Sequence, residues 1–91
     1  MPALHLTVRG KVQGVGFRWF VREIARRGDL AGWVRNLPDG AVELMAAGSE
    51  QGLSRLLEAI SRGPDRARVD EVRQAPLPSE HGLTRPFAVL K

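Results

Sequence analysis

The residues of this chain best suited to chemistry lie at positions 12–18, which read VQGVGFR. Gly14 and Gly16 can adopt positive φ and let a ligand approach the main chain without a Cβ in the way. Backbone N–H groups in such a loop bind phosphate oxygens, above all where the loop opens into a helix N-terminus. Arg18 would add a planar fork of donors that matches a phosphate group. The stretch therefore predicts an anion-binding loop.

A lone pair of glycines also occurs in purely structural connections, and this is the alternative role of Gly14 and Gly16. Two better-known phosphate loops do not match. The segment GKVQGVGF differs from G-x-x-x-x-G-K-[ST], and GVGFRW lacks the third glycine of G-x-G-x-x-G. Nucleotide binding is therefore not indicated, and a phosphate site in this loop would depend on Arg18 and on a second motif.

The second motif is NLPDG at residues 36–40, which begins with Asn36. A carboxamide has an acceptor oxygen and two N–H donors, so Asn36 could hold a water molecule in line with a leaving group. Asparagine is also a common turn residue, and Asp39 in the same segment has the character of one. The sequence leaves both roles of Asn36 open.

Hydrophobic periodicity predicts the elements that would position these residues. Apolar residues alternate at 4–8 and again at 42–46, which indicates two strands with one buried face. Helical spacing over about 17–27 predicts a helix that Gly28 would end. A further strand is expected at 30–36, so that it forms a hairpin with 42–46 through the NLPDG turn.

The second half of the chain continues in the same way. Ser49 is suited to cap a second helix, which should end at the RGPD segment. A fourth strand begins near Ala67, and its alternation breaks at Val72, where we expect a bulge. APLPSEHGLTRP at 75–86 is expected to be a loop, before a short last strand at 87–89.

This order, β-α-β-β-α-β with a short C-terminal strand, predicts a ferredoxin-like α+β fold in a single domain, residues 1–91. Two helices should pack on one face of an antiparallel sheet. In that topology the first and second strands run in the same direction, with the third between them. The end of each then lies at the same edge, which would bring Arg18 close to Asn36.

The segments VRGKVQGVGFR and GWVRNLPDG, followed by GP and ARVDEV, together resemble the acylphosphatase family over about Leu4 to Val89. That family consists of small ferredoxin-like enzymes that hydrolyse carboxyl-phosphate anhydrides without a metal or cofactor. The resemblance implies that Arg18 binds the phosphate of a small acyl phosphate substrate and that Asn36 positions the attacking water. It implies a phosphate-binding loop made of Gln13, Gly14, Val15, Gly16, Phe17 and Arg18. Leu37 departs from the family, because many members carry threonine there.

The residue types that this sequence lacks are consistent with the same chemistry. The chain has no cysteine and no tyrosine, and for His5 and His81 we expect solvent or hydrogen-bonding roles rather than metal binding. No general acid is evident, whereas hydrolysis of a phosphate ester usually needs one. A carboxylate leaving group has a conjugate-acid pKa of only ~4, so it can depart unprotonated. An acyl phosphate therefore suits the residues better than a phosphate ester.

Composition and charge leave other functions to consider. The net charge is +4, which is typical either of an anion-binding protein or of a solvated arginine-rich surface. One alternative is a nucleic-acid-binding module, but LHLTVRG and AVELMAAG carry no aromatic residue on which a base could stack. Another is a non-catalytic domain, such as the acylphosphatase-like part of a larger carbamoyl-transfer protein.

The aromatic residues and Lys11 could form the surroundings of the site. Trp19, Trp33 and Phe20 could line an acyl pocket, although core packing is the default role for aromatic residues. Lys11 could contribute to the local field or be a solvated charge. With 43% hydrophobic and 26% charged residues and no apolar run long enough for a signal peptide or membrane span, we expect a cytoplasmic monomer without membrane or nucleic-acid partners.

Overall fold

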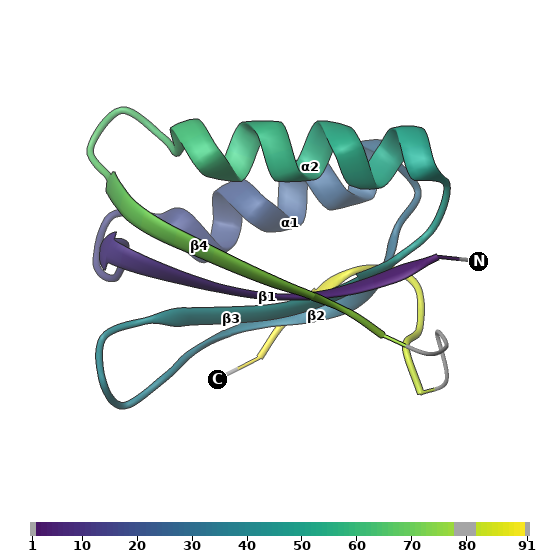
Figure 1. Ribbon diagram of the computed structural model, residues 1–91, viewed down its shortest axis with the longest axis horizontal. Helices are drawn as coiled ribbons and strands as arrows, with labels where there is room; N and C mark the ends of the chain where they lie inside the picture. Colours follow the sequence, from purple (N-terminus) through teal and green to yellow (C-terminus); the bar gives the residue numbers. More distant parts are fainter. Residues whose placement is uncertain (1, 78–81, 91) are drawn as a thin grey trace.

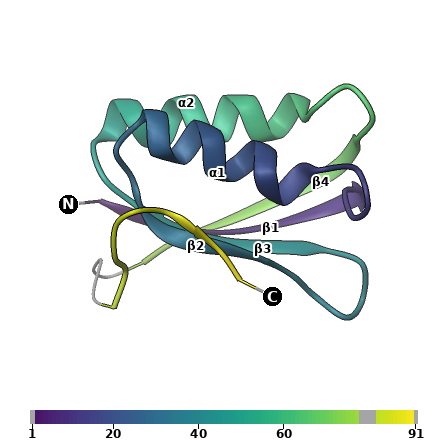
Figure 2. The ribbon, with the colours of Figure 1, turned by 180° about the vertical axis from the view of Figure 1, so that it is seen from behind.

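The computed structural model describes residues 2–77 and 82–90. Two helices cover one face of a five-stranded sheet, and the opposite face is left open (Figures 1 and 2). The elements in chain order are β1 Ala3–Lys11, α1 Phe17–Arg27, β2 Ala31–Asn36, β3 Val42–Ala47, α2 Glu50–Arg62, β4 Arg68–Pro76 and β5 Ala88–Val89. The predicted order of helices and strands is confirmed. None of the helices in the described part is long and apolar enough to cross a membrane.

The sheet has the strand order β4-β1-β3-β2-β5, so β3 lies between β1 and β2 as predicted. β3 is antiparallel to both neighbours, with Leu6 opposite Leu44 and Val34 opposite the same residue. The prediction of a sheet that is antiparallel throughout was wrong in one respect. β5 pairs with β2 in parallel, so the sheet is mixed. The hairpin turn between β2 and β3 and the loop after β1 lie at the same end of the sheet (Figure 1).

The helix boundaries follow from their caps. Ser49 caps α2, and its hydroxyl oxygen accepts a hydrogen bond from the Gly52 N–H at 3.0 Å. Helix α1 ends near Gly28 as predicted, but the residue in the left-handed conformation is Asp29, at φ 55°. The N–H groups of Asp29 and Leu30 bond back to the carbonyls of Arg26 and Ala25, which is the Schellman pattern.

The core fills the space between the helices and the covered face of the sheet. Its largest fully buried side chains are Phe17, Phe87, Leu6, Leu30, Leu44, Leu56 and Ile60. The predicted irregularity in the fourth strand exists but lies earlier than Val72. The register shifts between Arg9 and Gly10 of β1, which leaves Asp70 of β4 unpaired. β4 also runs on to Pro76, into the segment expected to be a loop.

Candidate active site

The loop between β1 and α1 curls back at two glycines. Gly14 and Gly16 both have φ 76°, and Gly16 occupies the N-cap position of α1 in the left-handed conformation. Gly16 has no side chain to accept a bond from the first N–H groups of the helix, and these groups have no partner within the helix itself. The first turn of α1 also carries no acidic residue. The loop therefore leaves a helix N-terminus open to an anion.

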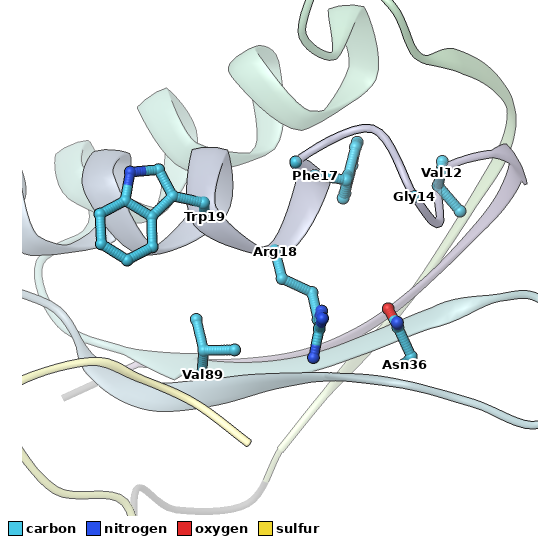
Figure 3. Close-up of a pocket in the computed structure, with 8 residues that line it drawn as sticks. Val12, Gly14, Phe17, Arg18, Trp19, Asn36 and Val89 are labelled. Carbon is cyan, nitrogen blue, oxygen red and sulfur yellow. The ribbon is translucent and has the colours of Figure 1, made fainter. Parts of the chain in front are cut away.

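Arg18 lies in this first turn and points across the end of the sheet. Its Nη1 donates a hydrogen bond to the carbonyl of Leu90, at 3.3 Å, just beyond β5. A cavity of about 190 Å³ opens here, and Arg18 lines it together with Gly14, Gly16 and Asn36 (Figure 3). The two side chains with the greatest predicted importance, Arg18 and Asn36, thus come from segments far apart in sequence and meet in one pocket.

Asn36 reaches the pocket because of strand alternation. Val34 faces the helices from β2, and Asn36, two residues further on, lies on the same face at the end of that strand. Its Oδ1 atom is buried and has no hydrogen-bond partner among the described residues. Since buried polar atoms are almost always paired, this oxygen is an acceptor available to a bound molecule. Figure 3 shows the carboxamide directed toward the loop, beside the Arg18 guanidinium.

Gln13 joins the two motifs. Its side-chain N–H₂ group donates to the carbonyl of Leu37 and to that of Ala41, each at 2.9 Å. Both carbonyls belong to the turn that follows Asn36, so the Gln13 side chain fastens the turn to the loop. Sequence reasoning placed Gln13 in the loop but gave its side chain no role.

The six residues predicted for the loop divide into two groups. Gly14, Gly16, Phe17 and Arg18 line the cavity. Gln13 and Val15 are not among its lining residues, and Val15 packs against the core. The ring of Phe17 is fully buried in that core, so Phe17 can offer a ligand little beyond its backbone N–H.

Of the three aromatic residues that could line an acyl pocket, one lines the cavity and two do not. Trp19 lines the cavity and is exposed, so the default expectation of core packing was wrong for it. Trp33 alternates with Val34 and therefore lies on the open face of the sheet, away from the cavity. Phe20 contacts Phe17, with ring centroids 6.1 Å apart, and does not line it. Val89 of β5 forms part of the wall and was not anticipated, because a two-residue strand gives almost no periodic signal.

Charged groups around the turn have structural partners. Asp39 accepts a hydrogen bond from the Ala41 N–H at 3.0 Å and one from Arg9 at 2.8 Å, which confirms it as a turn residue. The bond from Arg9 and that from Ala41 hold the pKa of Asp39 below its ordinary value.

Lys11 is exposed and is not among the residues that line the cavity. Among the described residues, no group of three or more His, Asp or Glu side chains could hold a metal ion.

Comparison with known proteins identifies the family of this chain. The acylphosphatase family model matches residues 4–89. The chain belongs to the acylphosphatase family. It is 48% identical over 82 residues to the acylphosphatase of Nitratidesulfovibrio vulgaris, covering 90% of this chain and 82% of that protein. As a member of the family it is a hydrolase that acts on acyl phosphates.

Solved structures that match this chain include one of the same extent and one of a much longer chain. The crystal structure of Bacillus subtilis acylphosphatase superposes on this chain with a TM-score of 0.94 at 38% sequence identity. The match covers 100% of each chain. T. kodakarensis HypF matches with a TM-score of 0.84 at 35% identity, covering all of this chain but 12% of that one. Leu37, where the resemblance led us to expect threonine, takes part in the turn through both its main-chain N–H and its carbonyl.

Proposed function

We propose that this acylphosphatase hydrolyses the carboxyl-phosphate bond by attack of a positioned water on phosphorus, with Arg18 and Asn36 as its catalytic residues. The observation that carries the proposal is the buried, unpartnered Oδ1 of Asn36 beside the Arg18 guanidinium in one pocket. A turn residue at this position would need neither feature. A donor such as the O–H of water satisfies the oxygen, and an anion satisfies the guanidinium.

The phosphoryl group is held by charge and by main-chain donors. Arg18 has five N–H donors, of which one is engaged by the Leu90 carbonyl, so the rest of its fork can meet phosphate oxygens. The open N-terminus of α1 and the loop that contains Gly14 and Gly16 offer backbone N–H groups. These donors neutralise the charge that spreads over the equatorial oxygens in the transition state.

Asn36 then orients the nucleophile. If Oδ1 accepts one O–H of the water, a lone pair of that water is free to face phosphorus. A bond forms between the water oxygen and phosphorus, and the bond from phosphorus to the acyl oxygen breaks. The carboxylate leaves with the bonding electron pair, and both protons of the water remain on inorganic phosphate. The acyl phosphate dianion and water thus become a carboxylate and dihydrogen phosphate.

The leaving group explains how so few residues suffice. Apart from Arg18, the residues that line the described cavity are apolar, glycine or Asn36, so it presents no carboxyl or imidazole as an acid. A carboxylate with a conjugate-acid pKa of ~4 leaves without a proton. Positioning and charge stabilisation can then carry the whole rate enhancement, in keeping with phosphoryl transfer in general.

The test is hydrolysis of benzoyl phosphate in ¹⁸O-labelled water with EDTA present. We expect activity to persist and the label to enter inorganic phosphate rather than benzoate, with inorganic phosphate acting as a competitive inhibitor. The uncatalysed reaction in the same buffer is the control. Label in benzoate would mean attack at the carbonyl carbon and would refute the mechanism. Activity lost in EDTA and restored by a divalent ion would place a metal in it.

We further propose that the protein acts as a monomer, without nucleic-acid partners. Trp19 and Leu90 are the only large apolar side chains exposed among the described residues, and Trp19 lines the proposed active site. That leaves little apolar surface for an extensive subunit interface. A place in the cytoplasm stays a prediction from the sequence.

A further inference from the structure

Of the two large apolar side chains that are exposed in the described chain, Trp19 lines the cavity beside Arg18. Trp19 is 60% exposed and Leu90 is 39% exposed. Trp19 follows Arg18 in α1, and the Leu90 carbonyl accepts the hydrogen bond from Arg18. Leu90 is in turn anchored to the sheet, because its N–H donates to the Val34 carbonyl at 2.8 Å. The exposed indole of Trp19 thus lies beside the one cationic group that lines the cavity, whereas Leu90 contacts Arg18 through its main chain.

The exposed indole is held in place. The guanidinium carbon of Arg22, one helical turn further along α1, lies 4.1 Å from the centroid of the Trp19 ring. Arg22 also donates a hydrogen bond to Glu23 at 3.0 Å, which fixes the cation. A cation-π contact of this kind orders a ring that would otherwise rotate freely. The ring therefore forms a preorganised surface, and a ligand that packs on it loses less entropy in doing so.

The cavity has a polar end and an apolar end. Figure 3 shows the loop and Asn36 on one side of the Arg18 guanidinium, with Val89 and then Trp19 on the other. If phosphate lies between the loop and Arg18, the rest of the substrate extends toward Val89 and Trp19. An acetyl group has a single methyl to place there, whereas an aromatic acyl group presents a flat face to the indole.

We propose that Trp19 and Val89 form an acyl-binding surface that makes this enzyme favour acyl phosphates with aromatic or bulky apolar acyl groups over acetyl phosphate. The proposal rests on the placement of phosphate described under the proposed function and goes beyond it by naming a residue that sets acyl specificity. Apolar contacts of this size discriminate between substrates by about 10- to 100-fold.

The first test compares kcat/KM for benzoyl phosphate and acetyl phosphate in the wild type and in Trp19→Ala. We expect the benzoyl-to-acetyl ratio to fall by about tenfold, and Trp19→Phe to retain most of it. Taking the ratio between variants cancels the different intrinsic reactivity of the two substrates. Trp33→Phe is the matched control: its ring also lies under an arginine, Arg35 at 5.2 Å, but on the open face of the sheet. It should leave the ratio unchanged.

The second test does not require turnover. Trp33→Phe leaves Trp19 as the single tryptophan, whose emission can be followed during titration with benzylphosphonate or methylphosphonate. Benzylphosphonate should bind about tenfold more tightly and shift the emission. Equal dissociation constants, or a Trp19→Ala variant whose ratio equals that of the wild type, would overturn the proposal. If neither acyl phosphate is hydrolysed, the proposed function fails while the phosphonate titration still decides the role of Trp19.

Discussion

At the scale of single residues, Asn36 shows how a strand can deliver a polar group to an apolar face. The alternation of β2 places it in line with Val34, and its Oδ1 is buried without a partner among the described residues. An unsatisfied buried acceptor costs about 1–3 kcal/mol of stability. Its position is predictable from the sequence, because Asn36 continues the Val34 period. Whether it serves the turn or a ligand is not, because that depends on hydrogen bonds formed after folding.

Gln13 illustrates what periodicity does not reveal. Its side chain bonds two carbonyls that lie 24 and 28 residues further along the chain, in the turn after Asn36. Nothing in the local sequence encodes such a distant pair. The structure therefore adds a residue that ties the turn after Asn36 to the loop, without itself lining the cavity.

Replacing Gln13 with alanine should lower kcat by about tenfold to a hundredfold, because small displacements of a positioned group have effects of this size. The inhibition constant for phosphate should change much less, since the loop backbone and Arg18 remain. Arg9→Ala is the matched control. It removes the other tie to the turn, the exposed 2.8 Å bond to Asp39, and should have little effect on kcat.

Steady-state kinetics with phosphate inhibition, and thermal melts as a check on folding, decide this prediction for Gln13. Gln13→Glu sharpens it, because the variant keeps the shape but turns an acceptor oxygen toward the two carbonyls. We expect it to be at least as impaired as Gln13→Ala. A wild-type kcat in Gln13→Glu would show that the hydrogen bonds from Gln13 to the turn do not position Asn36.

At the scale of elements, a carboxylate ties three strands together on the open face of the sheet. Glu43 of β3 bonds His5 of β1 at 2.8 Å and Arg35 of β2 at 2.6 Å. His5 thus has a hydrogen-bonding role, as predicted. Partial burial raises the pKa of Glu43, but the bonds from His5 and Arg35, together with the charge of Arg35, outweigh it and hold that pKa below 4.5.

Because the pKa of Glu43 is lower in the folded than in the unfolded chain, its stabilisation is present above about pH 4.5 and is lost as the pH falls through the folded pKa. Glu43→Gln should therefore lower the free energy of unfolding by on the order of 1 kcal/mol at pH 7 and have a smaller effect at pH 3. Urea unfolding at both pH values measures this. Glu58→Gln, in an exposed helical pair with Arg62, is the control. An equal loss at both pH values would argue against the titration.

The elements also show where sequence patterns stop being informative. Hydrophobic alternation and helix caps were enough to predict β1, β2, β3 and both helices. These elements depend on local periodicity and on capping residues such as Ser49. The bulge at Asp70 and the parallel pairing of β5 were not located, because both depend on the register between strands. Asp29 takes the left-handed position after α1 although Gly28 precedes it, since asparagine and aspartate tolerate that conformation.

At the scale of the whole molecule, topology makes the site. β1 and β2 run in the same direction on either side of β3, so the loop after β1 and the turn after β2 lie at one end of the sheet (Figure 1). α1 begins at that end, which brings its open N-terminus and Arg18 to Asn36. β5 adds the wall with Val89 beside β2. Long-range pairing thus brings together the residues of the proposed phosphate site from two motifs that are only moderate evidence separately.

The central claim is that Arg18 holds phosphate while Asn36 holds water, and the most direct measurement is kcat together with the inhibition constant for phosphate in Asn36→Ala. We expect kcat to fall by about 10²–10³-fold, while phosphate inhibits almost as in the wild type and the melting temperature does not drop. Arg18→Ala, by comparison, should weaken phosphate inhibition strongly. A near-normal kcat in Asn36→Ala, or a loss of phosphate binding that parallels the loss of kcat, would contradict this division of roles.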